Sequence, residues 1–384
     1  MSDINLGLVE CLWLGCTLIS LFGCAYALYA CSLAARFARQ NGAQVSDLEP
    51  VSLIKPLYGA EPELVENLAS FSRQVYNAPL QIVCGVQSSI DSAVEIVNQV
   101  KTEHPDVDLT LVSNAARHGE NPKISNIINI MPFVRHGIII LSDSDIRVDA
   151  HYVGRVVAAL QQPGVGLVTC LYRGRAASGA WSRLAAAAVD LHFLPGVLVG
   201  TALGLAKPCF GSTIALRAET LQRIGGFDAF ADTLADDYAM GEAVRGLGLE
   251  VAIAPFVVGH TFAETSFAEL FAHELRWVRT IRLVDSWGYA GSIVTHPLPF
   301  ALAALVLSGF SITAGIFVVM TLACRTLLSI QVAGIPGGSG SSIALVPVRD
   351  LLSFVVFVVS FVSGKVSWRG RRYEINADGS MKHM

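Results

Sequence analysis

Charged residues are scarce in this sequence. Only 15% of its 384 residues are charged and 53% are hydrophobic, whereas about a quarter of the residues in an average soluble domain are charged. The net charge of −4 also lacks the basic excess of nucleic-acid-binding proteins, so we expect no nucleic acid among its partners. The length accommodates one large domain together with membrane segments.

The cysteine pattern argues against a zinc-binding or disulfide-rich protein. Eight cysteines are present, but no two have Cys-x-x-Cys spacing, so a zinc site or a disulfide framework is unsupported. We interpret the cysteines as apolar side chains in a reducing compartment. Four of them lie in the first hydrophobic stretch, namely Cys11, Cys16, Cys24 and Cys31.

The first uncharged stretch, residues 11–35, is longer than the roughly 20 residues that a helix needs to cross a bilayer. A cleaved signal peptide would begin with basic residues, yet Asp3 precedes the stretch and Arg36 and Arg39 follow it. Because basic flanks stay in the cytoplasm, we expect residues 1–40 to form an uncleaved transmembrane anchor with a cytoplasmic C-terminal end.

Residues 297–364 hold the other hydrophobic segments. No charge occurs from position 297 until Arg325, and a further apolar block follows a glycine-rich loop. Arg349 and Asp350 interrupt that block. Charges there are expensive unless paired, so we expect a mutual ion pair at a helix end. Two crossings are the simplest count, with the loop at 337–342 outside.

The tail, residues 365–384, is basic and is therefore expected to be cytoplasmic. Its basic residues are Lys365, Arg369, Arg371 and Arg372.

Between residues 45 and 265 the pattern changes to short apolar runs that alternate with helical segments. Such alternation predicts an α/β domain with a parallel sheet and helices on both faces. Ligands in such sheets bind outside the carboxyl ends of the strands. The predicted strands are 51–55, 80–86, 107–112 and 137–141, and the predicted helices are 61–73, one that follows Asp91, 124–133 and 149–161.

Two carboxylates follow the fourth predicted strand directly. In an extended segment Asp143 and Asp145 lie on the same side. They could hold Mg²⁺ or Mn²⁺, with phosphate oxygens as the remaining ligands. The alternative is a helix cap, in which Asp145 or Asp149 starts the helix of residues 149–161.

Other polar residues are predicted at the same edge. Asp91 follows the second strand, where it could recognise a nucleotide, cap the next helix, or do both. Lys123 and Lys55 stand near this edge, where cations can meet a diphosphate; each is alternatively a solvated surface lysine.

A second pair of acids, Asp236 and Asp237, lies in an otherwise apolar neighbourhood. One of the two could accept the proton of an attacking hydroxyl. The alternative is an N-cap followed by a first-turn acid that the helix dipole stabilises.

Residues 266–285 form an amphipathic helix in which His273, Arg276, Arg279 and Arg282 recur every three residues as a basic ridge. We interpret 266–296 as an interfacial region with aromatic and basic side chains at headgroup level. An arginine of this ridge could also reach a diphosphate through forked hydrogen bonds.

His192 lies in an apolar stretch. Its default interpretation is a hydrogen-bonded structural histidine, and a role in binding an acceptor is the alternative.

Taken together, these motifs resemble a known family. Asp91, Asp143-Ser-Asp145, Ala235-Asp-Asp-Tyr238 and His273-Glu-Leu-Arg-Trp277 occur in the order seen in inverting glycosyltransferases of the GT-A (Rossmann-like) fold. Within that group the chain resembles ceramide glucosyltransferases and, most of all, bacterial hopanoid-biosynthesis-associated glycosyltransferases. The stretches that carry this are Lys55-Pro-Leu57, Gly85-Val-Gln87, Asn121-Pro-Lys123, Pro208-Cys-Phe-Gly-Ser212 and Trp368-Arg-Gly-Arg-Arg-Tyr373.

The resemblance implies roles for individual residues. Asp91 would contact the nucleotide base, Asp143 and Asp145 the diphosphate and the metal, and Asp237 would be the general base, with Asp236 beside it. Arg276 and Trp277 match the last motif of the family. The chain departs from the family at His273, where the broader family has Gln or Arg, and at Ser88, where relatives often have Asp.

The resemblance also implies an activity. We expect a multi-pass enzyme of the inner membrane, with its catalytic domain facing the cytoplasm, that moves N-acetylglucosamine from a UDP-sugar to a hopanoid polyol. The alternative acceptor is ceramide, with UDP-glucose as the donor. The alternative from another class is a membrane nucleotide-sugar sensor or scaffold without catalysis.

Overall fold

The computed structural model describes residues 2–40, 48–338 and 343–362, and the backbone of 366–368, 371–375 and 381–383. The chain divides into two compact units, each assembled from segments that are separated in the sequence. The sheet unit comprises Gln40–Ala177, Lys207–Ala263 and Lys365–Met384, and the helical unit comprises Met1–Arg39, Ser178–Ala206 and Glu264–Gly364.

The sheet unit is built on an eight-stranded sheet with the strand order β3-β2-β1-β4-β7-β6-β8-β5. Strands β3, β2, β1 and β4 are mutually parallel, whereas β7 runs antiparallel to both β4 and β6. The strands are β1 (Val51–Pro56), β2 (Leu80–Val86), β3 (Asp108–Ser113), β4 (Ile138–Leu141), β5 (Ile146–Arg147), β6 (Val165–Ala176), β7 (Ile214–Arg217) and β8 (Glu250–Phe262).

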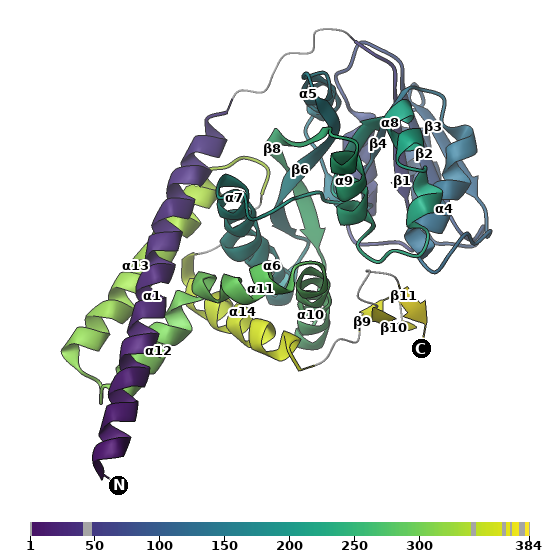
Figure 1. Ribbon diagram of the computed structural model, residues 1–384. Coiled ribbons are helices and arrows are strands. Elements are labelled where there is room, and N and C mark those ends of the chain that lie inside the picture. Colours follow the sequence, from purple (N-terminus) through teal and green to yellow (C-terminus); the bar gives the residue numbers. More distant parts are fainter. Residues whose placement is uncertain are drawn as a thin grey trace. The chain divides into compact units, whose positions relative to one another are not determined.

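Helices cover this sheet. The helices of the unit are α2 (Leu64–Ser72), α3 (Ala93–Glu103), α4 (Pro122–Ile130), η1 (Met131–Phe133), α5 (Tyr152–Leu160), α8 (Ala218–Arg223), η3 (Phe227–Phe230) and α9 (Asp236–Gly246). Figure 1 shows α4, α8 and α9 along one face of the sheet. Their apolar residues, among them Ile127, Leu221 and Met240, form one buried cluster with Ile54 and Leu216 of the strands.

The predicted elements of the first half of this unit are confirmed, with boundaries that move by a few residues. The four predicted strands correspond to β1, β2, β3 and β4, and their parallel pairing is confirmed. The sheet as a whole is mixed because β7 enters in the opposite direction. The predicted strands end at residue 141, so the prediction of a parallel sheet did not cover β7.

The helical unit contains the long apolar segments. Its helices are α1 (Ser2–Ala38), α6 (Gly179–Ala188), the π-helix η2 (Val189–Phe193), α7 (Leu194–Ala202), α10 (Phe267–Val284), α11 (Ser286–Gly291), η4 (Ser292–Thr295), α12 (Pro297–Leu307), α13 (Ile312–Ala333), η5 (Ile343–Leu345) and α14 (Val346–Ser360). Helices α12 and α13 pack against α1 (Figure 1).

In the described part of the chain, four helices are long and apolar enough to cross a membrane: Gly7–Ala38, Gly179–Ala202, Ile312–Ala333 and Ile343–Ser360. The bent pair Ser286–Thr295 and Pro297–Leu307 makes a fifth candidate if it counts as one span. The stretch 179–202 was not predicted as a candidate span. The division of the chain into anchor, catalytic, interfacial and membrane segments stays a prediction.

The structure resolves one open point in residues 297–364 and overturns one expectation. The uncharged block before Arg325 contains two helices, because a turn with positive φ at Gly309 and Phe310 separates α12 from α13. Arg349 and Asp350 do not pair with each other; each forms its own buried ion pair with another helix.

Two further expectations lie outside the described residues. The loop at 337–342 falls there from position 339 onward, and the side chains of the basic tail, 365–384, are not described. Its backbone contributes three short antiparallel strands, β9 (Val366–Trp368), β10 (Arg371–Ile375) and β11 (Met381–His383).

Candidate functional site

Lys55 forms hydrogen bonds with the segment that follows β4. The ammonium of Lys55, at the end of β1, donates to the carbonyl of Asp143 at 2.5 Å and to Ser142 Oγ at 3.3 Å. Lys55 is fully buried, and its ammonium lies 3.8 Å from the centre of the Phe71 ring. Burial lowers the pKa of Lys55 to about 8, although Asp145 and Asp143 act in the opposite direction. Its predicted contact with a diphosphate stays a prediction.

The second acid of this segment, Asp145, points toward β8. Its Oδ2 lies 3.1 Å from His260 Nε2. Its carbonyl accepts the N–H of Thr261 at 2.8 Å, which extends the pairing of β5 and β8. The His260 ring is stacked on Phe262, with the ring centres 4.6 Å apart. These contacts fix the orientation of Asp145. Neither Asp145 nor Asp149 is the N-cap of α5, which is His151.

The start of α4 explains the Asn-Pro-Lys sequence. Asn121 is the N-cap, and its Oδ1 accepts the N–H groups of Lys123 and Ile124. Pro122 occupies the first helical turn, where no backbone donor is needed. The amide Nδ2 of Asn121 donates to Asp236 Oδ1 at 3.3 Å. The cap therefore holds the beginning of α4 beside the beginning of α9.

Lys123 joins the two predicted acid pairs. Its ammonium lies 2.8 Å from Asp143 Oδ1 and 3.3 Å from Asp236 Oδ2. Burial alone would lower the pKa of Lys123, but the carboxylates of Asp143, Asp236 and Asp237 raise it above its usual value. The lysine is therefore charged, and it brings together acids that are far apart in the sequence.

Asp237 contacts Gly211, whereas Asp236 contacts Lys123. Asp237 Oδ2 accepts the N–H of Gly211 at 3.0 Å, and its Oδ1 accepts the N–H of Tyr238 at 2.8 Å. The N-cap of α9 is Ala235, so neither acid is the cap. Burial and the neighbouring Asp236 raise the pKa of Asp237 to about 6. A carboxylate with such a pKa is suited to accept a proton near neutral pH.

Gly211 lies where three site residues meet. Its carbonyl accepts the N–H of Asp143 at 3.1 Å, and its N–H donates to Asp237. A Cβ at this position would overlap with Asp143 Oδ2 and come within 2.9 Å of Lys123 Nζ. A Cβ here would therefore displace the ends of the Asp143 and Lys123 side chains.

We predict that Gly211→Ala lowers kcat/KM by about 10²-fold, because displacing catalytic groups by about 1 Å has an effect of this size. Steady-state kinetics together with a melting curve measure this. Gly137→Ala is the matched control, since a Cβ there meets no atom within 4 Å. Normal activity of Gly211→Ala would show that the positions of Asp143 and Lys123 are unimportant for turnover.

One side-chain oxygen of Asp91 accepts hydrogen bonds from two backbone N–H groups. Its Oδ1 accepts the N–H groups of Gly59 and Ala93, both at 2.9 Å. It thus holds the start of α3 and the loop after β1, although the N-cap residue of α3 is Ser92. Among the described residues Oδ2 has no hydrogen-bond partner. The predicted contact with a nucleotide base stays a prediction that this geometry permits.

The last predicted motif belongs to the helical unit, on α10. His273 Nδ1 lies 2.5 Å from Glu264 Oε1, and the His273 and Trp277 rings meet edge to face at 4.7 Å. Burial, and then the charge of Arg282, lower the pKa of Arg279. Their predicted roles toward the donor, and that of Arg276, stay predictions.

His192 also belongs to the helical unit, within η2. Its Nε2 lies 3.1 Å from both Asp350 Oδ1 and Arg325 Nη2. These contacts fit the interpretation as a hydrogen-bonded structural histidine, and the acceptor role stays a prediction.

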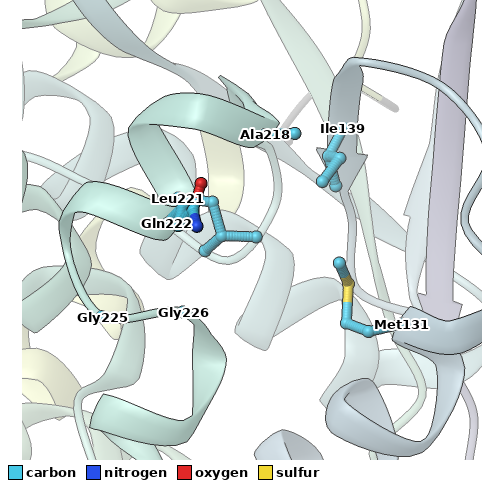
Figure 2. Close-up of a pocket in the computed structure, with 7 residues that line it drawn as sticks. All are labelled: Met131, Ile139, Ala218, Leu221, Gln222, Gly225 and Gly226. Carbon is cyan, nitrogen blue, oxygen red and sulfur yellow. The ribbon is translucent and has the colours of Figure 1, made fainter.

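A pocket of about 520 Å³ lies elsewhere in the sheet unit (Figure 2). Ala218 donates its N–H to the carbonyl of Gly137, which places the pocket at the amino end of β4. It contains none of the predicted site residues, so we assign it no part in the chemistry. It is lined by Met131, Ile139, Ala218, Leu221, Gln222, Gly225 and Gly226.

The acids after β4 fit a divalent cation. The side chains of Asp143 and Asp145 are 34% and 35% exposed, so an ion can reach them. Carboxylates are the oxygen ligands that Mg²⁺ and Mn²⁺ accept, usually with phosphate and water completing the shell. Among the described residues no group of three or more His, Cys, Asp or Glu side chains could hold a metal.

Three contributors to the site were not predicted. Glu61 Oε2 accepts from Ser144 Oγ at 2.5 Å, and His260 fixes Asp145. Gly211 was noted only as part of a similar stretch. A glycine between a buried strand and the preceding loop could have indicated a close approach, whereas His260 lies in an ordinary strand and carries no signal.

Sheet order, site position and acid pairs define a class of protein. The fold is that of the GT-A-like glycosyltransferases, a mixed α/β sheet with its polar site at the carboxyl ends of the parallel strands. The model of glycosyl transferase family 21 matches residues 15–381, so the chain belongs to that family.

Curated relatives agree with this assignment. Ceramide glucosyltransferase 1 of Caenorhabditis elegans is 23% identical over 347 residues, which are 87% of this chain and 73% of the relative. Ceramide glucosyltransferase 3 of the same organism is 28% identical over 244 residues, 61% of this chain and about half, 51%, of the relative.

Among solved structures, the chain is similar to a mannosyltransferase of Pyrobaculum calidifontis, solved with GDP-Man and Mn²⁺. The TM-score is 0.53 and the sequence identity 20%, over 93% of this chain and 98% of that chain. At this identity the likeness establishes the fold alone.

Proposed function

We propose that this chain is a membrane-bound inverting glycosyltransferase that moves a sugar from a UDP-sugar to a lipid hydroxyl. One observation carries the proposal. Lys123 and Gly211 link Asp143, the first acid of the pair that could hold a metal, to Asp236 and Asp237, the pair that could supply the base. Chemistry of this class needs both a diphosphate site and a base within one site.

The mechanism assigns the base to Asp237. As the acceptor hydroxyl attacks the anomeric carbon, the bond from that carbon to the diphosphate breaks, and the hydroxyl proton passes to the Asp237 carboxylate. Each carboxylate oxygen can accept more than one hydrogen bond, so the bonds from Gly211 and Tyr238 orient the group and leave room for the proton.

The leaving diphosphate carries the negative charge of the reaction. Asp143 and Asp145 would hold Mg²⁺ or Mn²⁺, which supplies positive charge to the diphosphate when bound. Lys123 adds a fixed charge of the protein beside Asp143. Arg276 and Trp277, with His273 and Arg279 beside them, are proposed to act on the same donor, as the family resemblance implies, and Asp91 to contact its base.

For the substrates, we propose UDP-N-acetylglucosamine as the donor and a hopanoid polyol as the acceptor, on the resemblance described above. The named relatives support a second candidate, a ceramide glucosyltransferase that uses UDP-glucose. We further propose a multi-pass protein of the inner membrane with a cytoplasmic catalytic domain; the apolar helices support the multi-pass part of this proposal.

The deciding experiment crosses UDP-N-acetylglucosamine, UDP-glucose and GDP-mannose with a hopanoid polyol and ceramide, using the purified full-length protein and mass spectrometry of the lipid products. Transfer from UDP-N-acetylglucosamine to the hopanoid supports the first candidate, and glucosylceramide supports the second. A protein that binds UDP-sugars but releases no UDP with any lipid extract would instead be a sensor or scaffold.

We predict that kcat/KM falls about tenfold per pH unit below pH 6. A base must be deprotonated to act, and burial together with Asp236 raises the pKa of Asp237 to about 6. Activity therefore rises with pH through this value and levels off above it. A pH profile from 4.5 to 8 measures the effect, with protein integrity checked at each pH. A profile that is flat from pH 5 to 7 would contradict it.

A further inference from the structure

Two adjacent charged residues of α14 are buried and serve different partners. The guanidinium of Arg349 forms a fork on Glu274 of α10, with Nη1 at 2.6 Å from Oε1 and Nη2 at 2.7 Å from Oε2. Arg349 also donates to the carbonyl of Leu184 in α6 and to Ser353 Oγ. Its donors are thus spread over α6, α10 and α14 itself, which fixes the side chain in one orientation.

The next residue anchors α14 on its other side. The carboxylate of Asp350 accepts hydrogen bonds from Nε and Nη2 of Arg325, at 2.8 and 2.6 Å. The same Arg325 donates to the carbonyl of Leu191, at 3.0 Å, within the π-helix η2. Arg349, Asp350 and Arg325 are all fully buried. Buried pairs of this kind contribute little net stability, but they restrict geometry strongly because a charge without its partner is unfavourable.

Glu274 belongs to α10, the helix that carries the His273-Glu-Leu-Arg-Trp277 motif. Successive residues of a helix are rotated by about 100°, so Arg276 and Arg279 lie on the side of α10 roughly opposite Glu274. Fixing Glu274 against α14 therefore fixes which way that basic face is turned.

We propose that Arg349 is a positioning residue: its fork on Glu274 sets the rotation of α10 and thereby the direction of Arg276 and Arg279. The inference rests on the proposed function, in which these arginines bind the donor. Arg349 itself acts through Glu274 and does not touch substrate. The anchoring of α14 by Asp350 and Arg325 makes it a rigid support for this contact.

The test uses the full-length protein in detergent, with Glu274→Gln, Arg349→Lys and the double variant. Glu274→Gln keeps the side-chain shape, and Arg349→Lys keeps the charge but loses the fork. Each single variant is expected to raise both the Kd for the UDP-sugar, measured by calorimetry, and its KM about tenfold, with a smaller change in kcat. The double variant should be no worse than the worse single variant, because both remove one contact.

Val356→Ala is the matched control. Val356 is buried on the same helix, so its truncation lowers the melting temperature without removing the ion pair. Unchanged donor Kd in both single variants, additive effects in the double variant, or an equal rise of Kd in Val356→Ala would each overturn the inference. The Kd needs no acceptor, so a wild-type protein that binds UDP-sugar but transfers nothing would refute the proposed function and leave this test intact.

Discussion

Replacing Asp237 by asparagine is expected to lower turnover by about 10² to 10⁴ while the protein stays folded and binds UDP-sugar. Loss of a general base typically has an effect of this size. Asparagine keeps the shape of the side chain and one oxygen for the N–H of Gly211. Single-turnover kinetics with a saturating donor, together with a melting curve and a UDP-binding measurement, separate loss of chemistry from loss of structure.

Asp236→Asn provides the comparison. Asp236 is buried and bound by Asn121 and Lys123, so its replacement should mainly lower stability, by about 1–3 kcal/mol, as expected for a buried polar contact. Turnover by the folded fraction should change much less than in Asp237→Asn. Near-normal turnover in Asp237→Asn with an inactive Asp236→Asn would reverse the assignment. Normal turnover in both would show that this pair does not supply the base.

The sequence was informative where a local pattern determines local structure. The strand that ends before Asp143, the helix that begins after Asn121 and the amphipathic helix of α10 all have periodicities and start signals that depend on neighbouring residues only. Because carboxyl ends of parallel strands share one edge, it could also be predicted that Lys55, Asp91 and Asp143 belong to the same side of the sheet.

What could not be predicted are contacts between distant segments. No pattern indicates that Lys123 bridges Asp143 and Asp236, or that His260 orients Asp145. The direction of β7 could not be predicted either, since its three apolar residues and one arginine fit either direction.

The hydropathy pattern likewise identified the apolar segments, but it could not show which residues their charged side chains pair with. Arg349 and Asp350, adjacent in sequence, suggested one mutual pair, yet side chains next to each other on a helix point about 100° apart. Each therefore pairs with a different helix, through Glu274 and Arg325. The uncharged block before Arg325 breaks at Gly309, where the backbone turns with positive φ, and hydropathy does not record such a turn.

Removal of divalent metal is expected to abolish transfer, and addition of Mn²⁺ or Mg²⁺ to restore it. The protein offers two partly exposed carboxylates, Asp143 and Asp145, which fit a cation whose other ligands are phosphate and water. Metal assistance typically contributes several kcal/mol to the transition state, so Asp145→Asn should lower kcat on the order of 10²-fold or more, at about 1.4 kcal/mol per tenfold. Titration of Mn²⁺ in the presence of UDP, followed by electron paramagnetic resonance, measures the ion directly.

Asp149→Asn is the control for this prediction. Asp149 is exposed, accepts the N–H of His151 and pairs with Arg155, so it tests the effect of losing a carboxylate near the start of α5 without touching the proposed metal ligands. It should keep normal kcat and normal Mn²⁺ binding. Because Lys123 already places a positive charge 2.8 Å from Asp143, the opposite outcome is also well defined. Full activity in chelator, lost only when Lys123 is replaced by methionine, would mean that the lysine supplies the positive charge and that the metal assignment is wrong.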